Sequence, residues 1–200
     1  MTNPDYTALL FIIDRSGSMS TIKTDMEGGI QSILKDQDEL PGKCTVDIAY
    51  FDSDFEYPTK KALVSSASVS IEPRGLTALH DAIGRASTEF GASLADMPEN
   101  ERPSKVLVTI VTDGGENASK EWTSTSVKDL VEKQKNNYNW EFAFLGANQD
   151  AALVGHSFGI QHNLTYQATS AGVGVASTAM TNFTRSYRIG STPSFEDTSA

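Results

Sequence analysis

Two uninterrupted apolar segments constrain the fold of this chain more than any other feature of its sequence. Residues 6–13 read YTALLFII, and residues 105–113 read KVLVTIVTD. Strands that are apolar at every position, without alternation, are typical of parallel sheets whose two faces are both covered by helices. We therefore expect both segments to be central strands of an α/β sheet.

Amphipathic patterns around these segments predict the helices. Residues 20–38 carry apolar side chains at spacings of three and four, and a Pro-Gly pair follows as a stop signal. Similar patterns predict helices over 77–97, 123–137 and 172–187, with a short helix near 149–157. Each predicted helix except the last separates two strand-like segments, so strands and helices alternate along the chain.

The remaining strands are predicted at 44–52, at 140–146 and, from a weaker pattern, at 164–168. Residues 55–59 follow a turn-rich Asp-Ser-Asp sequence and contain Pro58, which a strand tolerates at a sheet edge. We expect a doubly wound, mostly parallel six-stranded sheet with helices on both faces and one antiparallel edge strand. In the common strand order 3-2-1-4-5-6, the two apolar segments are neighbours.

The length of the chain suits one domain, because about 200 residues can bury a core without a disulfide or a structural metal. We expect residues 1–188 to form that domain. Residues 189–200 show no periodicity, and we expect a flexible tail there.

Charge and composition exclude several classes of partner. The net charge is -10, whereas nucleic-acid binding depends on Lys and Arg that neutralise phosphates. No stretch reaches the roughly 18 apolar residues of a membrane span, and no basic segment precedes an apolar run at the amino terminus. Cys44 is the only cysteine and is expected to be a small buried hydrophobe. We expect a cytoplasmic protein that binds neither nucleic acid nor a membrane.

Polar side chains replace apolar ones abruptly where the first apolar segment ends, in FIIDRSGSMS. Asp14, Ser16 and Ser18 stand at every second position, so a curled loop can direct three oxygens at one centre. Thr77 stands at a predicted helix start, and Asp113 ends the second apolar segment. In doubly wound sheets, ligands bind beyond the carboxyl ends of the strands. Oxygen donors of this kind suit Mg²⁺, Mn²⁺ or Ca²⁺, so we expect the five side chains to form one metal site.

This combination resembles the von Willebrand factor A-type (VWA) domain and its metal-ion-dependent adhesion site (MIDAS), over about residues 6–188. The resemblance implies a Rossmann-like VWA fold in which the three hydroxyls touch the metal and the two aspartates bind it directly or through water. It also implies a protein–protein interaction module and not an enzyme, with a Glu or Asp of a protein partner completing the metal shell. Many proteins of this family work within larger assemblies.

The serine-rich loop admits other interpretations. Ser18 or Ser20 could simply cap the following helix, but capping explains neither Thr77 nor Asp113. A calcium-binding loop fails because Met19 stands where such a loop requires glycine. A third alternative keeps the metal site but gives it only a structural role, holding three loops together.

A serine hydrolase is the alternative from a different functional class. The sequence GHSFG matches the G-x-S-x-G pattern, with Ser157 as the nucleophile. In enzymes with this pattern an acid and then a histidine follow, whereas His162, the only later histidine, precedes the only later acids, Glu196 and Asp197. We favour a short helix that is closed by Gly159.

Three other polar features near these loops receive ordinary interpretations. We expect His80 to be an exposed or hydrogen-bonded residue at a helix start. Glu116 is interpreted as a solvated loop acid at the rim of the predicted site. The acidic segment DSDFE, residues 52–56, is interpreted as a charged edge that resists strand pairing.

Overall fold

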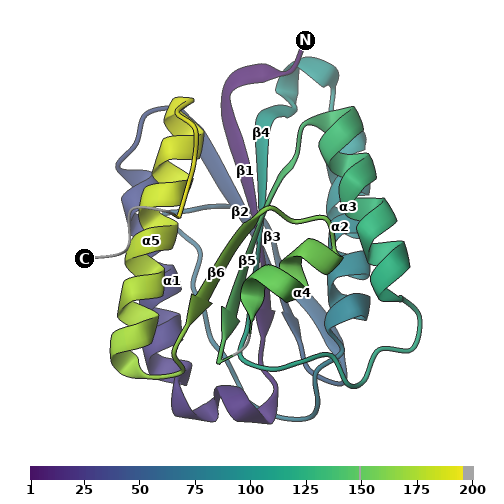
Figure 1. Ribbon diagram of the computed structural model, residues 1–200. Helices are drawn as coiled ribbons and strands as arrows, with labels where there is room; N and C mark the ends of the chain where they lie inside the picture. The colour runs from purple at the N-terminus through teal and green to yellow at the C-terminus, as the bar shows by residue number, and fades with distance from the viewer. Residues whose placement is uncertain (149, 196–200) are drawn as a thin grey trace.

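The computed structural model of the protein describes residues 1–148 and 150–195, in which strands and helices alternate along the chain (Figure 1). The strands are β1 (Asn3–Asp14), β2 (Lys43–Phe51), β3 (Phe55–Leu63), β4 (Pro103–Thr112), β5 (Glu141–Ala147) and β6 (His162–Tyr166). The helices are α1 (Lys23–Asp38), α2 (Leu79–Ala95), α3 (Ser124–Tyr138), α4 (Ala151–Ser157) and α5 (Ser170–Ile189), with short 3₁₀ turns η1 (Gly17–Thr21) and η2 (Glu99–Glu101). None of the described helices combines the length and the apolarity that a membrane span requires.

The strands form one sheet in the order β3-β2-β1-β4-β5-β6. In this order each strand runs parallel to its neighbours, except at the edge, where β3 pairs antiparallel with β2. This arrangement confirms the predicted fold class with its single antiparallel edge strand, and the strand order is the common one for such sheets. The two apolar segments, β1 and β4, are neighbours at the centre of the sheet.

Alternate side chains of β1 pack against the two helical layers, which explains why this strand is apolar at every position. Leu9 and Phe11 belong to the core beneath α1 and α5, whereas Leu10 and Ile12 belong to the core beneath α2, α3 and α4. Figure 1 shows these two helical layers on opposite faces of the sheet. Each large side chain buried in this way stabilises the fold by about 1.5–3 kcal/mol.

The edge strand β3 is longer than the predicted 55–59 and continues to Leu63. Its side chains alternate between half-buried and exposed positions, because one face packs on the sheet core and the other meets solvent. Phe55 and Tyr57 pack against the core on the α2 side. Pro58 lies at an exposed position of this edge strand, where its missing N–H is tolerated.

The helix predicted at 20–38 is divided into the 3₁₀ turn η1 and the α-helix α1. Within η1 the backbone N–H of Ile22 donates to the carbonyl oxygen of Met19 at 3.1 Å, and the Met19 side chain is fully buried. Because Met19 is buried, the 3₁₀ turn is held against the core. Ser16 lies directly before this turn and Ser18 lies within it, so both precede α1.

Part of the predicted tail lies within the described residues. Helix α5 ends at Ile189, and Phe195 stacks on Phe183 of α5 with ring centroids 4.6 Å apart. Phe195 thereby packs against the core beneath α1 and α5. The final part of the predicted tail, residues 196–200, lies outside the described residues.

Candidate metal site

The carboxyl ends of β1 and β4 bring two of the predicted site residues together. β1 and β4 are hydrogen-bonded neighbours, with Ile13 opposite Val111 near their ends. Asp14 is the last residue of β1, and Asp113 directly follows β4. The strand order reverses between these two strands, which is where doubly wound sheets bind their ligands.

Asp14 is fully buried and is held at both carboxylate oxygens. Its Oδ1 accepts a hydrogen bond from the backbone N–H of Ser16 at 2.6 Å, and its Oδ2 accepts one from Thr112 Oγ1 at 2.6 Å. Burial raises the pKa of Asp14 to about 6 despite these hydrogen bonds, and the neighbouring charge of Asp113 adds to the rise. Ionising this carboxyl therefore costs free energy unless a cation lies close by.

A chain of hydroxyl contacts connects the β1–α1 loop to the end of β4. Ser16 Oγ and Ser18 Oγ lie 3.2 Å apart, and Ser18 Oγ donates to Asp113 Oδ1 at 2.6 Å. Burial raises the pKa of Asp113, which is half-buried. Two carboxyls with raised pKa values thus share one small region with two hydroxyls.

Thr77 reaches the same region from the loop before α2. Its backbone N–H donates to Asn117 Oδ1 at 2.8 Å, and the backbone N–H of Asn117 donates to the Thr77 carbonyl at 3.0 Å. A β-carbon added to Gly114 would lie 3.4 Å from Thr77 Oγ1 and 3.8 Å from Ser18 Oγ. The hydroxyls of Thr77 and Ser18 therefore face the same small space beside Gly114.

The five predicted residues thus come together from three separate loops. Asp14, Ser16, Ser18 and Asp113 form a continuous hydrogen-bonded chain, and the hydroxyls of Thr77 and Ser18 both lie beside Gly114. The described residues contain no group of three or more His, Cys, Asp or Glu side chains placed to hold a metal ion. Any cation bound here would therefore depend on the hydroxyl oxygens as well as on the two carboxylates.

Solved structures of three other proteins share this architecture. Proximal thread matrix protein 1 from the mussel byssus aligns with a TM-score of 0.65 at 12% identity, over 90% of this chain and 47% of its own. The von Willebrand factor type A structure from Catenulispora acidiphila aligns with a TM-score of 0.61 at 13% identity, over 88% and 42% of the two chains. The vWF domain of the type V pili tip protein Mfa5 from Porphyromonas gingivalis aligns with a TM-score of 0.63 at 10% identity, over 92% and 95%.

This chain has the von Willebrand factor A-type fold. It spans less than half of the mussel and Catenulispora chains and nearly the whole of the Mfa5 domain. A second structure of the mussel protein has a zinc-occupied MIDAS motif and aligns with a TM-score of 0.61 at 12% identity, over 90% of this chain and 46% of its own. No protein-family model matches the sequence, and no curated protein does, so these similarities concern the fold.

An ion-pair cluster beside the candidate site of this VWA fold joins two acids of residues 52–56 to Arg15 and Arg74, two arginines that the sequence did not single out. Asp52 Oδ2 accepts hydrogen bonds from Arg15 Nε at 2.6 Å and from Arg74 Nε at 3.0 Å. Glu56 Oε1 accepts from the terminal nitrogens of the same two arginines, at 2.8 and 2.7 Å. Two acids of residues 52–56 therefore form ion pairs with the site loops, a role that the interpretation of this segment as a charged edge did not include.

The same hairpin also holds the loop that carries Thr77. The backbone N–H of Ala78 donates to the Asp52 carbonyl at 2.9 Å, and the backbone N–H of Leu76 donates to Ser53 Oγ at 2.9 Å. The turn between β2 and β3 thus fixes the backbone on both sides of Thr77. In this VWA fold, the β2–β3 hairpin positions two of the three loops of the candidate site.

Glu116 organises the loop that follows β4. Its carboxylate accepts hydrogen bonds from the backbone N–H groups of His80, Ala118 and Ser119, at 2.9, 2.9 and 2.7 Å, and from Ser119 Oγ at 2.7 Å. Burial raises the pKa of Glu116, but these hydrogen bonds outweigh that effect and lower it overall. Its interpretation as a solvated acid is wrong. His80 lies at the start of α2, and its ring packs edge-on against Phe158 with centroids 5.5 Å apart.

Ser157 stands at the end of a helix, not at its start. It is the last residue of α4, and its hydroxyl donates to the Val154 carbonyl at 2.6 Å within the same helical turn. The helix is followed by Gly159, which has a positive φ of 74°, as predicted for the residue that closes it. His162 lies near Glu141, with Nε2 and Oε1 3.5 Å apart. A nucleophile elbow requires a strand before the serine and a helix after it, and here a helix precedes Ser157.

Proposed function

We propose that this VWA domain is a metal-dependent protein-interaction module. A divalent cation binds at Asp14, Ser16, Ser18, Thr77 and Asp113, and a Glu or Asp side chain of a partner protein completes its coordination. The observation that supports this most directly is the meeting of three loops, each of which contributes oxygen donors, at the point where the strand order reverses.

The donor set fits Mg²⁺ or Mn²⁺ better than a softer metal. All five side chains offer hard oxygen atoms, and the set contains no thiolate or imidazole. The space beside Gly114, which a β-carbon would fill, is faced by two of the three hydroxyls. The raised pKa values of Asp14 and Asp113 indicate two carboxyls whose charge lacks compensation, and a cation supplies that compensation.

The residues around the site have distinct tasks in this proposal. Thr112 and the backbone N–H of Ser16 hold the Asp14 carboxylate, while Asn117 holds the backbone of Thr77. When bound, the cation supplies a local positive charge that attracts one further carboxylate.

The net charge of -10 would otherwise repel an acidic partner at long range. At physiological ionic strength this repulsion is screened beyond about 8 Å, so the local charge of the cation dominates at contact.

The similarity of fold to proteins that carry VWA domains, one of which has a zinc-occupied MIDAS motif, supports the same function. We propose further that the protein acts without catalysis, in the cytoplasm, and within a larger assembly whose other members supply the acidic side chain. Neither nucleic acid nor a membrane is a partner in this proposal, in keeping with the strongly negative net charge.

Isothermal titration of Mg²⁺ and of Mn²⁺ into the full chain tests the metal site. We expect saturable binding to the wild type and at least about tenfold weaker binding to Ser18→Ala and Asp113→Asn, since each loses a donor. Asp129→Asn, which changes an exposed acid on α3, is the matched control and should bind like the wild type. Equal binding by the wild type and Asp113→Asn would rule out the site.

Affinity capture from the native cell, once with Mg²⁺ and once with EDTA, tests the interaction. We expect partners that are retained only with Mg²⁺ and that are lost from Asp113→Asn. A site with only a structural role would give a different outcome: EDTA would lower the melting temperature, whereas the captured proteins would stay the same.

A further inference from the structure

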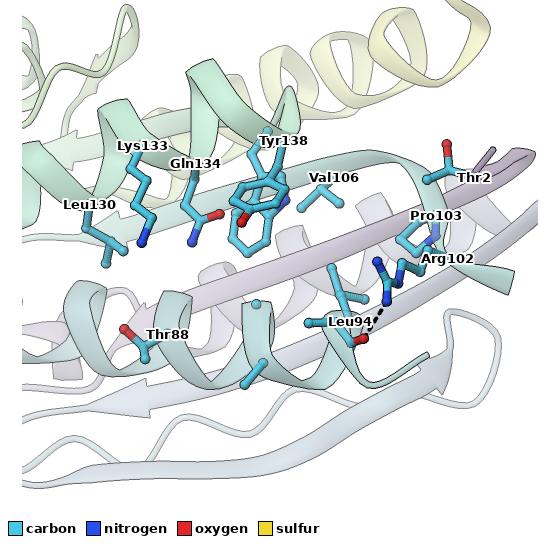
Figure 2. A pocket seen from close by; sticks show the side chains of 14 residues that line it. Thr2, Thr88, Leu94, Arg102, Pro103, Val106, Leu130, Lys133, Gln134 and Tyr138 are labelled. Atoms are coloured by element: carbon cyan, nitrogen blue, oxygen red, sulfur yellow. Dashed lines mark hydrogen bonds between the residues drawn. The ribbon is translucent and has the colours of Figure 1, made fainter. Parts of the chain in front are cut away.

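A groove between α2 and α3 lies at the end of the sheet opposite to the candidate metal site (Figures 1 and 2). Thr2 and Pro103 line it at the starts of β1 and β4, whereas Asp14 and Asp113 lie at the far ends of these strands. Its volume is about 470 Å³. Sites for small ligands usually measure roughly 300–1,000 Å³, so the groove has the size of such a site.

The wall of the groove is largely apolar and includes two aromatic side chains. Trp140, Val106 and Leu94 form its buried part and are 6%, 5% and 7% exposed. Leu130 and the more exposed Tyr138 continue the lining from α3, and Figure 2 shows the Tyr138 ring directed toward α2. These apolar side chains border the space of the groove, so a ligand inside it would contact them.

A glycine on α2 keeps the groove open. A β-carbon added to Gly91 would lie 3.5 Å from Gln134 Nε2 and 3.5 Å from the Trp140 ring, which is ordinary contact distance. Alanine would therefore fit at this position, and a longer side chain would extend into the groove. Glycine in a helix interior lowers stability by about 0.5–1 kcal/mol relative to alanine. At Gly91 this loss is not needed to avoid a steric clash, because an alanine would fit.

Gln134 places an unpartnered amide in the groove. This side chain is 8% exposed, and it makes no hydrogen bond with any residue in the described part of the chain. Figure 2 shows its amide pointing from α3 toward α2, and Lys133, the preceding residue of α3, also lines the groove. This amide can donate its N–H groups to a ligand that enters the groove and presents a hydrogen-bond acceptor.

The charges that line the groove are positive. Within the described residues, no Asp or Glu lines it, although the chain as a whole has a net charge of -10. Lys128 on α3 forms an ion pair with Glu132, with Nζ and Oε1 3.8 Å apart. Lys133 on the same helix lines the groove and has no ion-pair partner among the described residues. Arg102 lies at the other end and donates to the carbonyls of Met97 and Ala95 near the end of α2.

We propose that this groove binds a small aromatic monoanion. Its ring system lies against Trp140, Val106 and Leu94, and its anionic group accepts hydrogen bonds from the Gln134 amide and the Lys133 ammonium. The apolar wall, which includes the Trp140 ring, favours a flat apolar body, and the Lys133 ammonium and the Gln134 amide, which line the same groove, favour a negative headgroup. This binding site is independent of the proposed metal site.

Fluorescence titration of the full chain with two dyes tests the proposal. The anionic probe is 1-anilinonaphthalene-8-sulfonate, and the uncharged probe is N-phenyl-1-naphthylamine. We expect the anionic dye to bind at one saturable site. Gly91→Leu, which fills the groove, should abolish that binding, whereas Gly174→Leu, at an α5 glycine with open space around it, should leave it unchanged.

The headgroup contact is tested by Lys133→Gln, an exposed change that leaves the fold intact. We expect it to weaken the anionic dye about fivefold and to leave the uncharged dye unaffected, while Lys128→Gln on the same helix changes neither. Absence of saturable binding, full binding to a folded Gly91→Leu, or equal weakening of both dyes by Lys133→Gln would each overturn the proposal.

Discussion

Asp52 Oδ2 and Arg15 Nε lie 2.6 Å apart in a buried ion pair that joins the β2–β3 hairpin to the loop after β1. Their side chains are 2% and 6% exposed, so solvent screens the pair little. Arg15 stands between Asp14 and Ser16, and the pair therefore fixes the loop that carries three of the proposed ligands.

We expect Asp52→Asn to lower the free energy of unfolding by about 3 kcal/mol, because it leaves the Arg15 guanidinium buried without its closest counter-charge. The value is at the low end for a broken buried pair, since Glu56 still contacts Arg15. Urea unfolding at neutral pH measures the loss. Asp54→Asn, a change at an exposed acid in the same turn, should stay within about 0.5 kcal/mol of the wild type. Equal midpoints for the two variants would contradict the prediction.

The raised pKa of Asp14 predicts a stability change with pH in a metal-free buffer. The pKa in the folded state is about 6, above the unfolded value of 3.8, so the native state binds more protons between these values. The free energy of unfolding is therefore higher at low pH. It falls by at most roughly 3 kcal/mol as the pH rises from about 4 to about 6, because the folded state must then ionise a buried carboxyl.

Urea unfolding in EDTA across this pH range measures the effect, with Asp14→Asn as the comparison. The difference in stability between Asp14→Asn and the wild type should grow in favour of the variant as the pH rises. If the proposed site binds Mg²⁺, the cation at pH 7 should restore stability to the wild type more than to the variant. A difference that stays constant with pH would contradict the raised pKa.

Asp81 secures the loop between β4 and α3. Its carboxylate accepts hydrogen bonds from the backbone N–H groups of Lys120, Glu121 and Trp122 at 2.9, 3.0 and 2.8 Å. We expect Asp81→Asn to cost about 1–3 kcal/mol, because an amide N–H₂ would face backbone donors. Thermal unfolding and limited proteolysis of residues 114–122 should both register the change, and Asp129→Asn should alter neither.

Ser157 should not react as a nucleophile. Its hydroxyl donates to the Val154 carbonyl at the end of α4, which is not the exposed strand-to-helix turn of an activated serine. We expect a fluorophosphonate probe to leave the protein unlabelled and a generic ester to stay uncleaved. Labelling that disappears in Ser157→Ala would restore the hydrolase alternative.

The periodicity of the sequence predicted the sheet well because burial on two faces leaves a direct local signature. β1 and β4 are apolar throughout, whereas β3, with one face in solvent, alternates between half-buried and exposed positions. In the common strand order β1 and β4 are neighbours, as they are in the structure, and Asp14 and Asp113 lie at the carboxyl ends of these two strands. Their role as metal ligands remains a proposal.

The supporting contacts were missed because nothing local distinguishes them. Asp52 lies 37 residues from Arg15 in the sequence, and an acid in a turn looks the same whether it is solvated or paired. Glu116 was misinterpreted for the same reason, since its acceptor role depends on the start of α2, 36 residues earlier.

The sequence alone determined the alternation of strands and helices and the oxygen donors at the strand ends, because each depends on the neighbouring residues in the chain. Only the tertiary structure decided which loops meet, how far burial raises the pKa of Asp14, and that Gly91 faces Gln134 and Trp140 across an open groove. These properties arise where segments distant in sequence pack together, and the free energies of such contacts leave no trace in local periodicity.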